Sequence, residues 1–331
     1  MLTSLQITGF RNFSSLTMEG LTRVNLLVGE NNAGKTSVLE AIEILFLRLS
    51  GQPLALYRSS LRRKEFVLPI RDDEEGEVTT ILDLRHLFHG HEISPGSRFV
   101  LHGETSNGPT VIEYVIKENM PGISLGTIKS YLRNQNSKRQ TGQPNPLQFI
   151  EPITPSPGAL GALWDEIVLT PEESKVMEAL QIIQPDIERI ASVSYSSRYS
   201  SGMFVKLRDS EQRVPLGSMG EGFKRLLLLA MNLVASSGGY LLVDEIDTGL
   251  HYSVMVKMWK LVVETARRLN IQVFATAHSL DCIQALAGLY EREPDVRDDI
   301  SLHRIEKGAT ASVRYSADEI LSAAQRQVEV R

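Results

Sequence analysis

The sequence predicts an α/β fold in which a mixed central sheet is flanked by helices. An apolar run at 23–29 ends in glycine and leads, through a glycine-bearing loop, to an amphipathic helical pattern at 36–51. The last third of the chain alternates apolar runs at 240–245 and 271–279 with a helical segment near 252–269. Strands that alternate with helices favour a parallel sheet covered by helices.

The beginning and the middle of the chain predict different kinds of strand. Residues 2–28 predict paired strands, whereas residues 52–165 predict antiparallel strands among Gly, Pro and Asn turns. These antiparallel strands are expected at 77–88, 97–104 and 110–118. Residues 134–161 are rich in loop formers, so an exposed or mobile segment is expected there.

The sequence pattern changes near residue 50 from a strand, loop and helix to antiparallel strands and turns, and this change predicts a discontinuous core. We expect this core to comprise residues 1–50 and 190–331, with residues 51–189 inserted as a β-rich arm, a loop segment and a helix. No internal repeat is visible, and no heptad pattern predicts a long coiled coil.

Two helix starts carry capping signals. Thr170 as N-cap, a proline in the first turn and Glu173 predict a helix that runs to about residue 184. Ser316 and Glu319 predict the cap of a final helix, directly after a hairpin at 301–315.

Composition excludes several classes of protein. The 331 residues are 42% hydrophobic, which is enough for one large core or two modest ones, and the net charge of -5 excludes a uniformly basic surface. The basic run at 58–64 is then the local candidate for a DNA contact, against a plain solvated face. The single Cys282 forms no internal disulfide, the first residues lack a signal-peptide pattern, and the apolar run at 226–235 is too short to span a bilayer. A cytoplasmic protein without a membrane span is expected.

Residues 29–36, "GENNAGKT", match the complete Walker A pattern between a strand and a helix. In such a loop, backbone N–H groups surround phosphate oxygens, Lys35 neutralises the terminal phosphates, and the Thr36 hydroxyl is offered to Mg²⁺. The alternative, a glycine turn that matches by chance, fits this strand–loop–helix context poorly. The residues expected to bind ATP here are Gly29, Asn31, Asn32, Ala33, Gly34, Lys35, Thr36 and Ser37.

Two later strands end in residues with catalytic chemistry. The run 240–245 is an apolar strand that ends in Asp244, which can hold the hydration shell of Mg²⁺, and in Glu245, which suits a general base for the attacking water. The run 274–279 ends near His278, which could sense the γ-phosphate. The alternatives are a strand that meets solvent and a structural histidine; the presence and order of the Walker A loop favour the catalytic interpretation.

The stretch 216–225, "LGSMGEGFKR", precedes a leucine-rich helical run. By itself it predicts a glycine turn, but Ser218 and the backbone at Gly220 could bind phosphate at the start of a helix near Glu221. The histidines in "RHLFHGHE", 85–92, have a spacing that fits no standard zinc site, so no metal is expected there.

These motifs, in this order, resemble a P-loop NTPase of the ABC class, and its RecF/SMC-like heads more closely than transporter cassettes. The segments "ITGFRNF", "EALQIIQPDIERI" and "EIDTGLH" are most similar to the ATPase domain of OLD-family proteins and their prokaryotic AAA-type relatives. The resemblance implies a homodimer that sandwiches ATP, with Ser218 and Gly220 binding the γ-phosphate in trans and Asp247 in a D-loop at the interface. It also implies that Arg11 and Asn12 lie near the base or ribose.

Three differences from the resembled families bear on function. Met219 stands where the signature has its second glycine, and residues 52–165 offer no candidate for a Q-loop. Full OLD nucleases carry a Toprim domain, but only about 50 residues follow His278, and 295–299, "DVRDD", is expected to be a loop. We therefore expect no nuclease activity in this chain itself.

The sequence leaves several functions open. The first is an SMC/OLD-like ATPase whose ATP-driven dimerisation regulates a separately encoded effector, such as a nuclease, in antiphage defence or DNA maintenance. The second is a RecF-like repair ATPase that binds DNA directly. A transporter cassette would need a Q-loop and a membrane partner, and a protein that binds ATP without turnover is the structural alternative.

Overall fold

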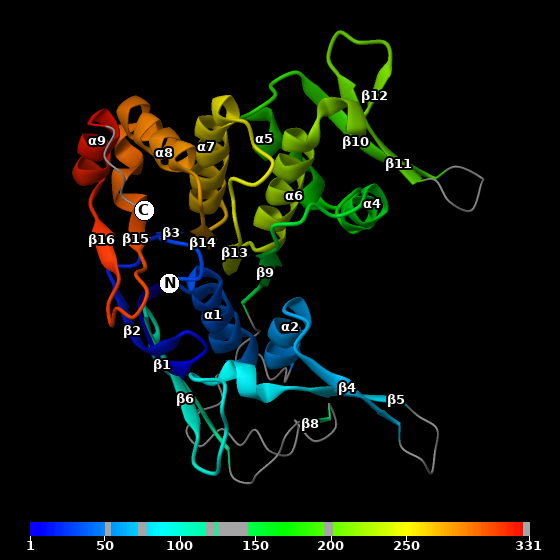
Figure 1. Ribbon diagram of the computed structural model, residues 1–331. Helices are drawn as coiled ribbons and strands as arrows, with labels where there is room; N and C mark the ends of the chain where they lie inside the picture. The colour runs from blue at the N-terminus through cyan, green and yellow to red at the C-terminus, as the bar shows by residue number, and fades with distance from the viewer. Residues whose placement is uncertain (50–53, 72–77, 117–122, 125–144, 195–200, 327–331) are drawn as a thin grey trace. The chain divides into compact units, whose positions relative to one another are not determined.

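The computed structural model describes residues 1–49, 54–71, 78–116, 123–124, 145–194 and 201–326. The contacts of the chain divide it into two compact units, whose helices and strands are labelled in Figure 1. Unit 1 comprises Met1–Thr22, Val28–Asn145 and His303–Arg314. Unit 2 comprises Arg23–Leu27, Pro146–Leu302 and Tyr315–Arg331.

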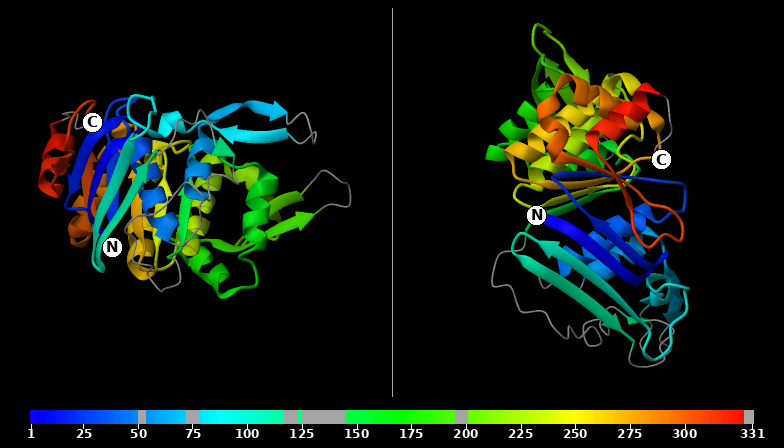
Figure 2. Two further views of the ribbon diagram at one scale, coloured as in Figure 1. Left: turned by 90° about the horizontal axis from the view of Figure 1, so that it is seen from below. Right: turned by 90° about the vertical axis from the view of Figure 1, so that its left-hand side faces the viewer.

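Unit 1 is built on an antiparallel sheet with the strand order β2-β1-β6-β7. Its strands are β1 (Leu2–Phe10), β2 (Phe13–Glu19), β6 (Arg98–Thr105) and β7 (Gly108–Val115). The right-hand view of Figure 2 shows these strands side by side in blue and cyan. Apolar side chains alternate along β1 and are buried, as Leu5 and Ile7 illustrate. Helix α1 (Lys35–Leu49) packs on this sheet, where a Cβ on Gly103 would lie 2.8 Å from Leu45.

A second antiparallel sheet of unit 1 follows helix α2 (Leu54–Arg62). Its strands, in the order β4-β5-β8, are β4 (Phe66–Arg71), β5 (Val78–Leu82) and β8 (Ile123–Ser124). The predicted antiparallel strands are thus confirmed by β5, β6 and β7, with one exception, while residues 77, 117 and 118 of the prediction lie outside the described residues. Residues 83–88 leave the strand for the 3₁₀ turn η1 (Leu84–Leu87), because the Asp83 carboxylate caps it by accepting a hydrogen bond from the amide of Arg85.

Unit 2 is built on a parallel sheet in which β3 (Val24–Val28), β14 (Gln272–Thr276) and β13 (Tyr240–Val243) are buried along their length. Strand β15 (Ile300–Arg304) lies beside β3, and β16 (Val313–Tyr315) follows it in the strand order, as the predicted hairpin requires. Continuous burial is typical of parallel strands covered by helices. The predicted α/β arrangement is therefore observed.

The predicted loop at 134–161 is wrong over part of its length, and residues 134–144 lie outside the described residues. Strand β9 (Leu147–Ile150) pairs in parallel with β13, and helix α4 (Pro157–Asp165) begins at an N-cap formed by Ser156. The hydrogen bonds of β9 come from a strand about 90 residues later in the chain, so local composition gave no sign of it. The units also depart from the predicted boundary at 190, because residues 146–189 share unit 2 with β13.

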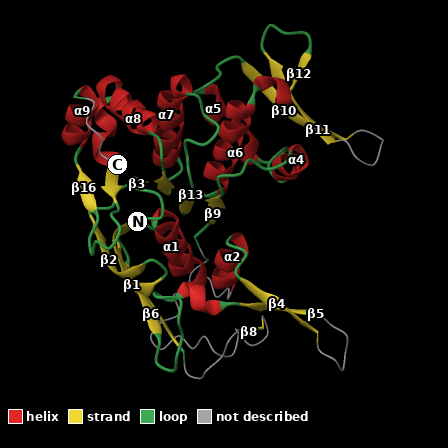
Figure 3. Ribbon diagram, in the orientation of Figure 1, coloured by secondary structure: helices red, strands yellow, loops and turns green. Residues whose placement is uncertain are grey.

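Each helix of unit 2 from α5 to α9 contacts the next one along the chain, and Figure 3 draws these helices in red. They are α5 (Pro171–Gln181), α6 (Glu221–Ala235), α7 (Tyr252–Arg268), α8 (Leu280–Arg292) and α9 (Ala317–Gln325). A small antiparallel sheet contains β10 (Ile187–Ser194), β11 (Ser201–Leu207) and β12 (Arg213–Pro215). The 3₁₀ turns η2 and η3 comprise Leu216–Met219 and Pro294–Asp299, so the loop expected at 295–299 is a short helical turn.

Both predicted helix caps are confirmed. The Thr170 hydroxyl accepts a hydrogen bond from the amide of Glu172, and the Glu173 carboxylate accepts one from the amide of Leu169. Ser316 and Glu319 form a complete capping box at the start of α9. No helix in the described part of the chain combines the length and the apolar character that crossing a bilayer needs.

Candidate functional site

The loop at 29–36, called here the phosphate loop, lies in unit 1 between β3 and α1. Two of its glycines adopt backbone conformations that side chains disfavour, with φ of 141° at Gly29 and 103° at Gly34. A Cβ on Gly29 would lie 2.2 Å from the carbonyl oxygen of Ile305, and a Cβ on Gly34 would lie 2.4 Å from the Phe13 ring. The glycines of the motif are therefore required by the space around the loop as well as by its conformation.

Lys35 is the first residue of α1 and folds back over the loop. Its side chain is buried, and its Nζ donates hydrogen bonds to the carbonyl oxygens of Gly29 at 2.7 Å and Glu30 at 2.9 Å. Thr36 is half-buried in the first turn of the same helix. The amides at this helix start and the lysine together form an arrangement suited to phosphate.

Asn12 lies beside the phosphate loop within unit 1. Its amide nitrogen lies 3.4 Å from the side-chain oxygen of Asn32, and its Oδ1 accepts a hydrogen bond from the Ser37 hydroxyl at 3.1 Å. The structure thus brings together three polar residues that the sequence had assigned to the nucleotide. Whether Asn12 contacts a base or ribose stays a prediction.

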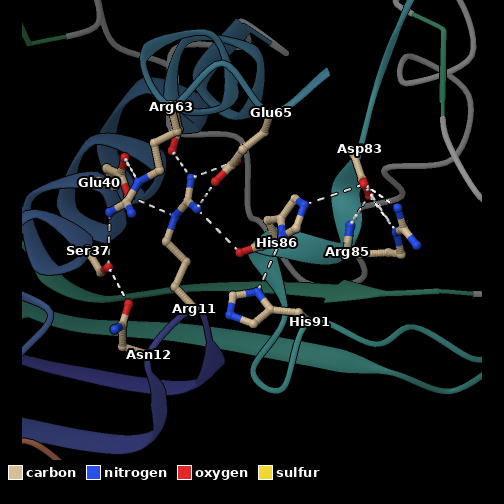
Figure 4. Close-up of polar contacts among 11 residues, drawn as sticks. Arg11, Asn12, Ser37, Glu40, Arg63, Glu65, Asp83, Arg85, His86 and His91 are labelled. Atoms are coloured by element: carbon tan, nitrogen blue, oxygen red, sulfur yellow. Dashed lines mark hydrogen bonds and ion pairs between the residues drawn. The ribbon is translucent and has the colours of Figure 1, made fainter. Parts of the chain in front are cut away.

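Arg11, the neighbour of Asn12, is the centre of a cluster of charged side chains, shown in Figure 4. Its Nε lies 2.7 Å from Glu40 Oε2, and its Nη1 lies 2.7 Å from Glu65 Oε1. Arg63 also contacts Glu40, at 2.8 Å. We call Arg11, Glu40, Arg63 and Glu65 the Arg11 cluster.

The burial of the Arg11 cluster changes the expectation for Arg11. Only 3% of the arginine is exposed, and its guanidinium also donates a hydrogen bond to the Ser59 hydroxyl at 2.8 Å. Its described contacts are thus with groups of its own unit, and this arrangement favours a structural role. The predicted contact of Arg11 with a base or ribose gains no support from it.

Part of the basic run at 58–64 forms ion pairs and hydrogen bonds within unit 1. Arg62 pairs with Glu43 of α1, and Arg63 donates a hydrogen bond to the Ser37 hydroxyl at 3.2 Å. Burial raises the pKa of Glu43, and the paired arginine opposes that rise. These pairs account for part of the basic run within the fold, and a DNA contact there stays a prediction.

The acids predicted as Walker B lie in unit 2, at the carboxyl end of β13. Thr276 ends the neighbouring strand β14, and its hydroxyl donates a hydrogen bond to Asp244 Oδ1 at 2.7 Å. The same hydroxyl oxygen accepts a hydrogen bond from the amide of Glu245 at 2.8 Å. Glu245 has a φ of 49°, in the left-handed region that few residues with a side chain occupy.

His278 and Asp247 lie close to these two acids. His278 Nε2 lies 3.2 Å from Glu245 Oε1, and the Thr248 hydroxyl donates to Glu245 Oε2 at 3.0 Å. The Asp247 carboxylate accepts hydrogen bonds from the amides of His278 at 3.4 Å and Ser279 at 2.8 Å. We call Asp244, Glu245, Asp247 and His278 the acidic edge; the structure brings these four predicted residues together.

The predicted signature residues lie at the start of α6. Ser218 is exposed in η2, and the exposed Gly220 is the N-cap of α6 with a φ of 87°. Apart from Gly220 itself and the adjoining residues of the chain, no atom of the described structure lies within 4 Å of the position that a Cβ on Gly220 would take. The predicted start of the helix at Glu221 is confirmed, and the segment is accessible to a ligand or to another chain.

Sequence reasoning missed Arg225. It lies inside α6 and is 3% exposed, and its guanidinium donates hydrogen bonds to the carbonyl oxygens of Glu151, Asp244 and Glu245 at 2.7, 3.1 and 3.2 Å. Burial lowers the pKa of Arg225. A basic residue directly before the leucine-rich run, within the same predicted helix, was the signal that could have found it.

Thr276 and Glu151 were missed as well. Thr276 stands in the apolar run that ends before His278, and a polar residue there could have drawn attention. Glu151 follows β9, which was predicted as loop, so its place beside the end of β13 could not be seen from the sequence.

The histidine-rich stretch after β5 contacts Arg11 as well as its own neighbours: the His86 carbonyl oxygen accepts a hydrogen bond from Arg11 Nη1 at 3.3 Å, and His89 Nδ1 lies 3.0 Å from the Arg11 carbonyl oxygen. His86 Nδ1 and His91 Nδ1 are 3.4 Å apart, and His86 Nε2 lies 3.5 Å from Asp83. Hydrogen bonds from Arg85 lower the pKa of Asp83. In the part of the chain that the structure describes, no three His, Cys, Asp or Glu side chains form a metal site.

Two family models match the chain in succession. The first is described as an AAA ATPase domain and matches residues 1–124. The second is described as an AAA domain, putative AbiEii toxin, Type IV TA system, and matches residues 125–281. Together they cover the phosphate loop, the signature segment and the acidic edge.

Individual proteins are similar over different lengths. An "ATP/GTP phosphatase" of Helicobacter pylori is 22% identical over 333 residues, which cover 86% of this chain and 87% of that protein. The "DNA double-strand break repair Rad50 ATPase" of Archaeoglobus fulgidus is 43% identical over 151 residues, or 42% of this chain and 16% of that protein. The solved Smc head domain of Pyrococcus furiosus superposes with a TM-score of 0.53 at 10% identity, covering 98% of this chain and 99% of the other, and this likeness shows the fold.

Proposed function

We propose that this chain is an ATPase head of the ABC class, in the RecF/SMC-like form, which binds ATP at the phosphate loop and hydrolyses it with the acidic edge; the two AAA domain matches and the ATP/GTP phosphatase relative support this proposal. The observation that carries the proposal is the loop itself. Two glycines leave no room for side chains, and Lys35 is held over the loop backbone at the start of α1. This arrangement offers amides and one cation to phosphate oxygens.

Mg²⁺ is the cofactor that the site would use with ATP. Its ligands are hard oxygens, and the metal usually takes one or two protein ligands together with phosphate and water. The Thr36 hydroxyl and the Asp244 carboxylate are groups of this kind, and Thr276 holds the carboxylate by a hydrogen bond. When bound, Mg²⁺ would neutralise charge on the phosphates.

Glu245 is proposed as the general base. Its two carboxylate oxygens contact His278 and Thr248, so the side chain is held at the end of the strand and is only half-buried. A carboxylate positioned in this way can orient a water molecule and accept its proton. His278 is proposed to respond to the γ-phosphate.

The accessible signature segment supports a proposal of dimerisation. Ser218 and Gly220 are exposed at the start of a fifteen-residue helix, where amides and the helix dipole favour an anion. We assign them to the γ-phosphate bound by a second copy of the chain, with Asp247 close to the interface. Hydrolysis would remove the bridging phosphate and thus the contact between the copies.

The proposed biological role is regulation of a separately encoded effector, such as a nuclease, in antiphage defence or DNA maintenance. The family description that includes a toxin system supports this assignment. The stretch shared with a Rad50 ATPase supports the second candidate, an ATPase that binds DNA itself. DNA-stimulated turnover that falls steeply with salt would favour the second candidate.

The phosphate-loop assignment is tested with Lys35→Ala. We expect the variant to lose most of its ATP affinity, measured by equilibrium binding of a fluorescent ATP analogue, because the lysine charge is removed from the loop. Lys307→Ala, at an exposed lysine of the same unit, is the matched control. Wild-type affinity in Lys35→Ala would refute the assignment.

The dimer assignment is tested with Ser218→Arg, which places a bulky cation in the signature segment. We expect loss of ATP-dependent dimers in sedimentation, while the monomer still binds ATP. Gln212→Arg adds the same charge at an exposed position before the segment and should leave dimerisation unchanged. Normal dimers and turnover in Ser218→Arg would show that the segment is only a turn.

A further inference from the structure

The Thr276 hydroxyl is hydrogen-bonded to both of the consecutive acids that follow β13, Asp244 and Glu245. The threonine side chain is completely buried at the end of β14, and both hydrogen-bonding capacities of its hydroxyl are used in unit 2. The proton is donated to Asp244 Oδ1, and a lone pair accepts the amide proton of Glu245. A single hydroxyl therefore binds two consecutive residues through opposite polarities.

The two bonds act on different properties of the acids. The bond to Asp244 fixes the rotation of a carboxylate, and a hydrogen bond to an ionised group is about twice as strong as one between neutral groups. The bond to the Glu245 amide restrains the backbone of this residue, whose φ of 49° is unfavourable for glutamate. Such a backbone persists where the surrounding contacts determine it, and the Thr276 hydroxyl is one of these contacts.

We infer that Thr276 is a positioning residue for ATP hydrolysis, which fixes the Asp244 carboxylate that would hold Mg²⁺ and keeps the Glu245 backbone in the conformation that directs its side chain to His278. The inference rests on the proposed function. Thr276 acts through the two acids and not on ATP or water directly.

The test compares Thr276→Val with Thr276→Ser in the full chain. Valine keeps the shape of threonine but removes the hydroxyl, whereas serine keeps the hydroxyl and removes only a methyl group. For Thr276→Val we expect kcat to fall about 10- to 100-fold, as loss of a hydrogen bond to a charged group implies. The KM for ATP should change little, because the phosphate loop is untouched.

A second measurement does not require turnover. The Mg²⁺ concentration that half-maximally increases binding of a fluorescent ATP analogue should rise severalfold in Thr276→Val, while binding without Mg²⁺ stays as in wild type. Thr276→Ser should restore both kcat and the Mg²⁺ midpoint to near the wild-type values. If Thr276 only stabilised the fold, Thr276→Val would lower the melting temperature. It would neither lower kcat selectively at an unchanged KM nor shift the Mg²⁺ midpoint.

Thr265→Val is the matched control. Thr265 is also completely buried in unit 2, on α7, but its hydroxyl oxygen has no hydrogen-bond partner among the described residues. The control should keep the wild-type kcat and Mg²⁺ midpoint. It separates the loss of a particular hydroxyl from the general effect of replacing a buried threonine.

The outcomes separate the inference from the proposed function. Wild-type kcat and Mg²⁺ midpoint in Thr276→Val would overturn the inference, and so would equal losses in the valine and serine variants. If the wild-type chain bound the analogue but released no phosphate, the proposed hydrolysis would be refuted. The Mg²⁺ midpoints of the variants would still show whether Thr276 positions Asp244. A wild-type chain that bound no analogue would overturn both.

Discussion

In unit 1 the Arg11 cluster consists of charged side chains that neutralise one another, whereas hydroxyl and backbone groups hold the acidic edge of unit 2. Glu40 is 1% exposed and contacts both Arg11 and Arg63. Asp244 is 8% exposed, and its carboxylate is held by Thr276, whose hydroxyl has no formal charge. The two regions thus restrain carboxylates by different means.

The way in which each region restrains its carboxylates indicates which role that region suits. A buried ion pair satisfies its charges within the fold, and removal of one partner leaves an uncompensated charge. A carboxylate oriented by a neutral dipole is held in place while its negative charge is not cancelled by that contact, so the charge can serve a metal ion. The contacts of the Arg11 cluster thus favour a role in stability, and those of the acidic edge fit the binding and catalysis proposed for it.

The largest expected effect is on turnover, through Glu245→Gln. Loss of the general base should lower phosphate release about 100- to 10,000-fold, with ATP binding retained and the ATP-bound dimer trapped. Phosphate release and sedimentation measure the two properties, and Glu264→Gln on α7 is the control because its side chain is 41% exposed. An unchanged rate would show that the acidic edge binds nucleotide without catalysis.

Arg11→Met should mainly affect stability. It leaves Glu40 and Glu65 without this buried partner, so the free energy of unfolding should fall by about 3–5 kcal/mol. Urea unfolding followed by circular dichroism measures the change. Arg98→Met is the control, because Arg98 is 70% exposed and forms a surface pair worth at most about 1 kcal/mol.

A triple variant sharpens the comparison. If Arg11→Met is destabilising because it exposes buried charge, then adding Glu40→Gln and Glu65→Gln should recover part of the lost stability. No recovery would mean that the packing of the arginine side chain, rather than its charge, stabilises unit 1.

His303 adds a pH-dependent element to unit 1. Burial, with a smaller effect from the charge of Arg314, lowers the pKa of His303 to about 4. The unfolded chain, with a histidine pKa of about 6.5, binds the proton more readily, so stability is full above that value and falls as pH drops toward 4. We expect a loss of about 2 kcal/mol between pH 7 and pH 5 from this group.

Urea unfolding at the two pH values measures that loss. In His303→Gln the difference between pH 7 and pH 5 should shrink by about the same 2 kcal/mol, because the side chain no longer titrates. An identical pH dependence in the variant and in the wild type would exclude His303 as its source.

The smallest expected effect belongs to the hydroxyl beside Arg11. Ser59→Ala removes one of the two acceptors of Arg11 Nη2, the other being Glu65 Oε2, and should lower the free energy of unfolding by about 1–2 kcal/mol. Ser60→Ala is a close control, since Ser60 is equally buried but its hydroxyl has no partner in the described part of the structure. Equal effects of the two substitutions would show that the contact with Arg11 contributes nothing measurable.

Much of the fold could be predicted because its signals are local. Burial along β3 and β13, the amphipathic pattern of α1 and the capping box of α9 each depend on residues close together in the chain. The phosphate loop was found for the same reason, since its glycines and Lys35 are consecutive with the strand and helix that they join. Strand β9 was missed because its stability comes from β13 and not from its own four residues.

The sequence by itself determined the α/β class, the phosphate loop and the strand ends that carry Asp244, Glu245 and His278. Only the tertiary structure decided that Arg11 is buried among glutamates and that Thr276 holds the two Walker B acids. The physical reason is that a motif fixes which groups are present, whereas the partner of each group is chosen by packing between segments far apart in the chain. For Thr276 and Asp244, that separation is 32 residues.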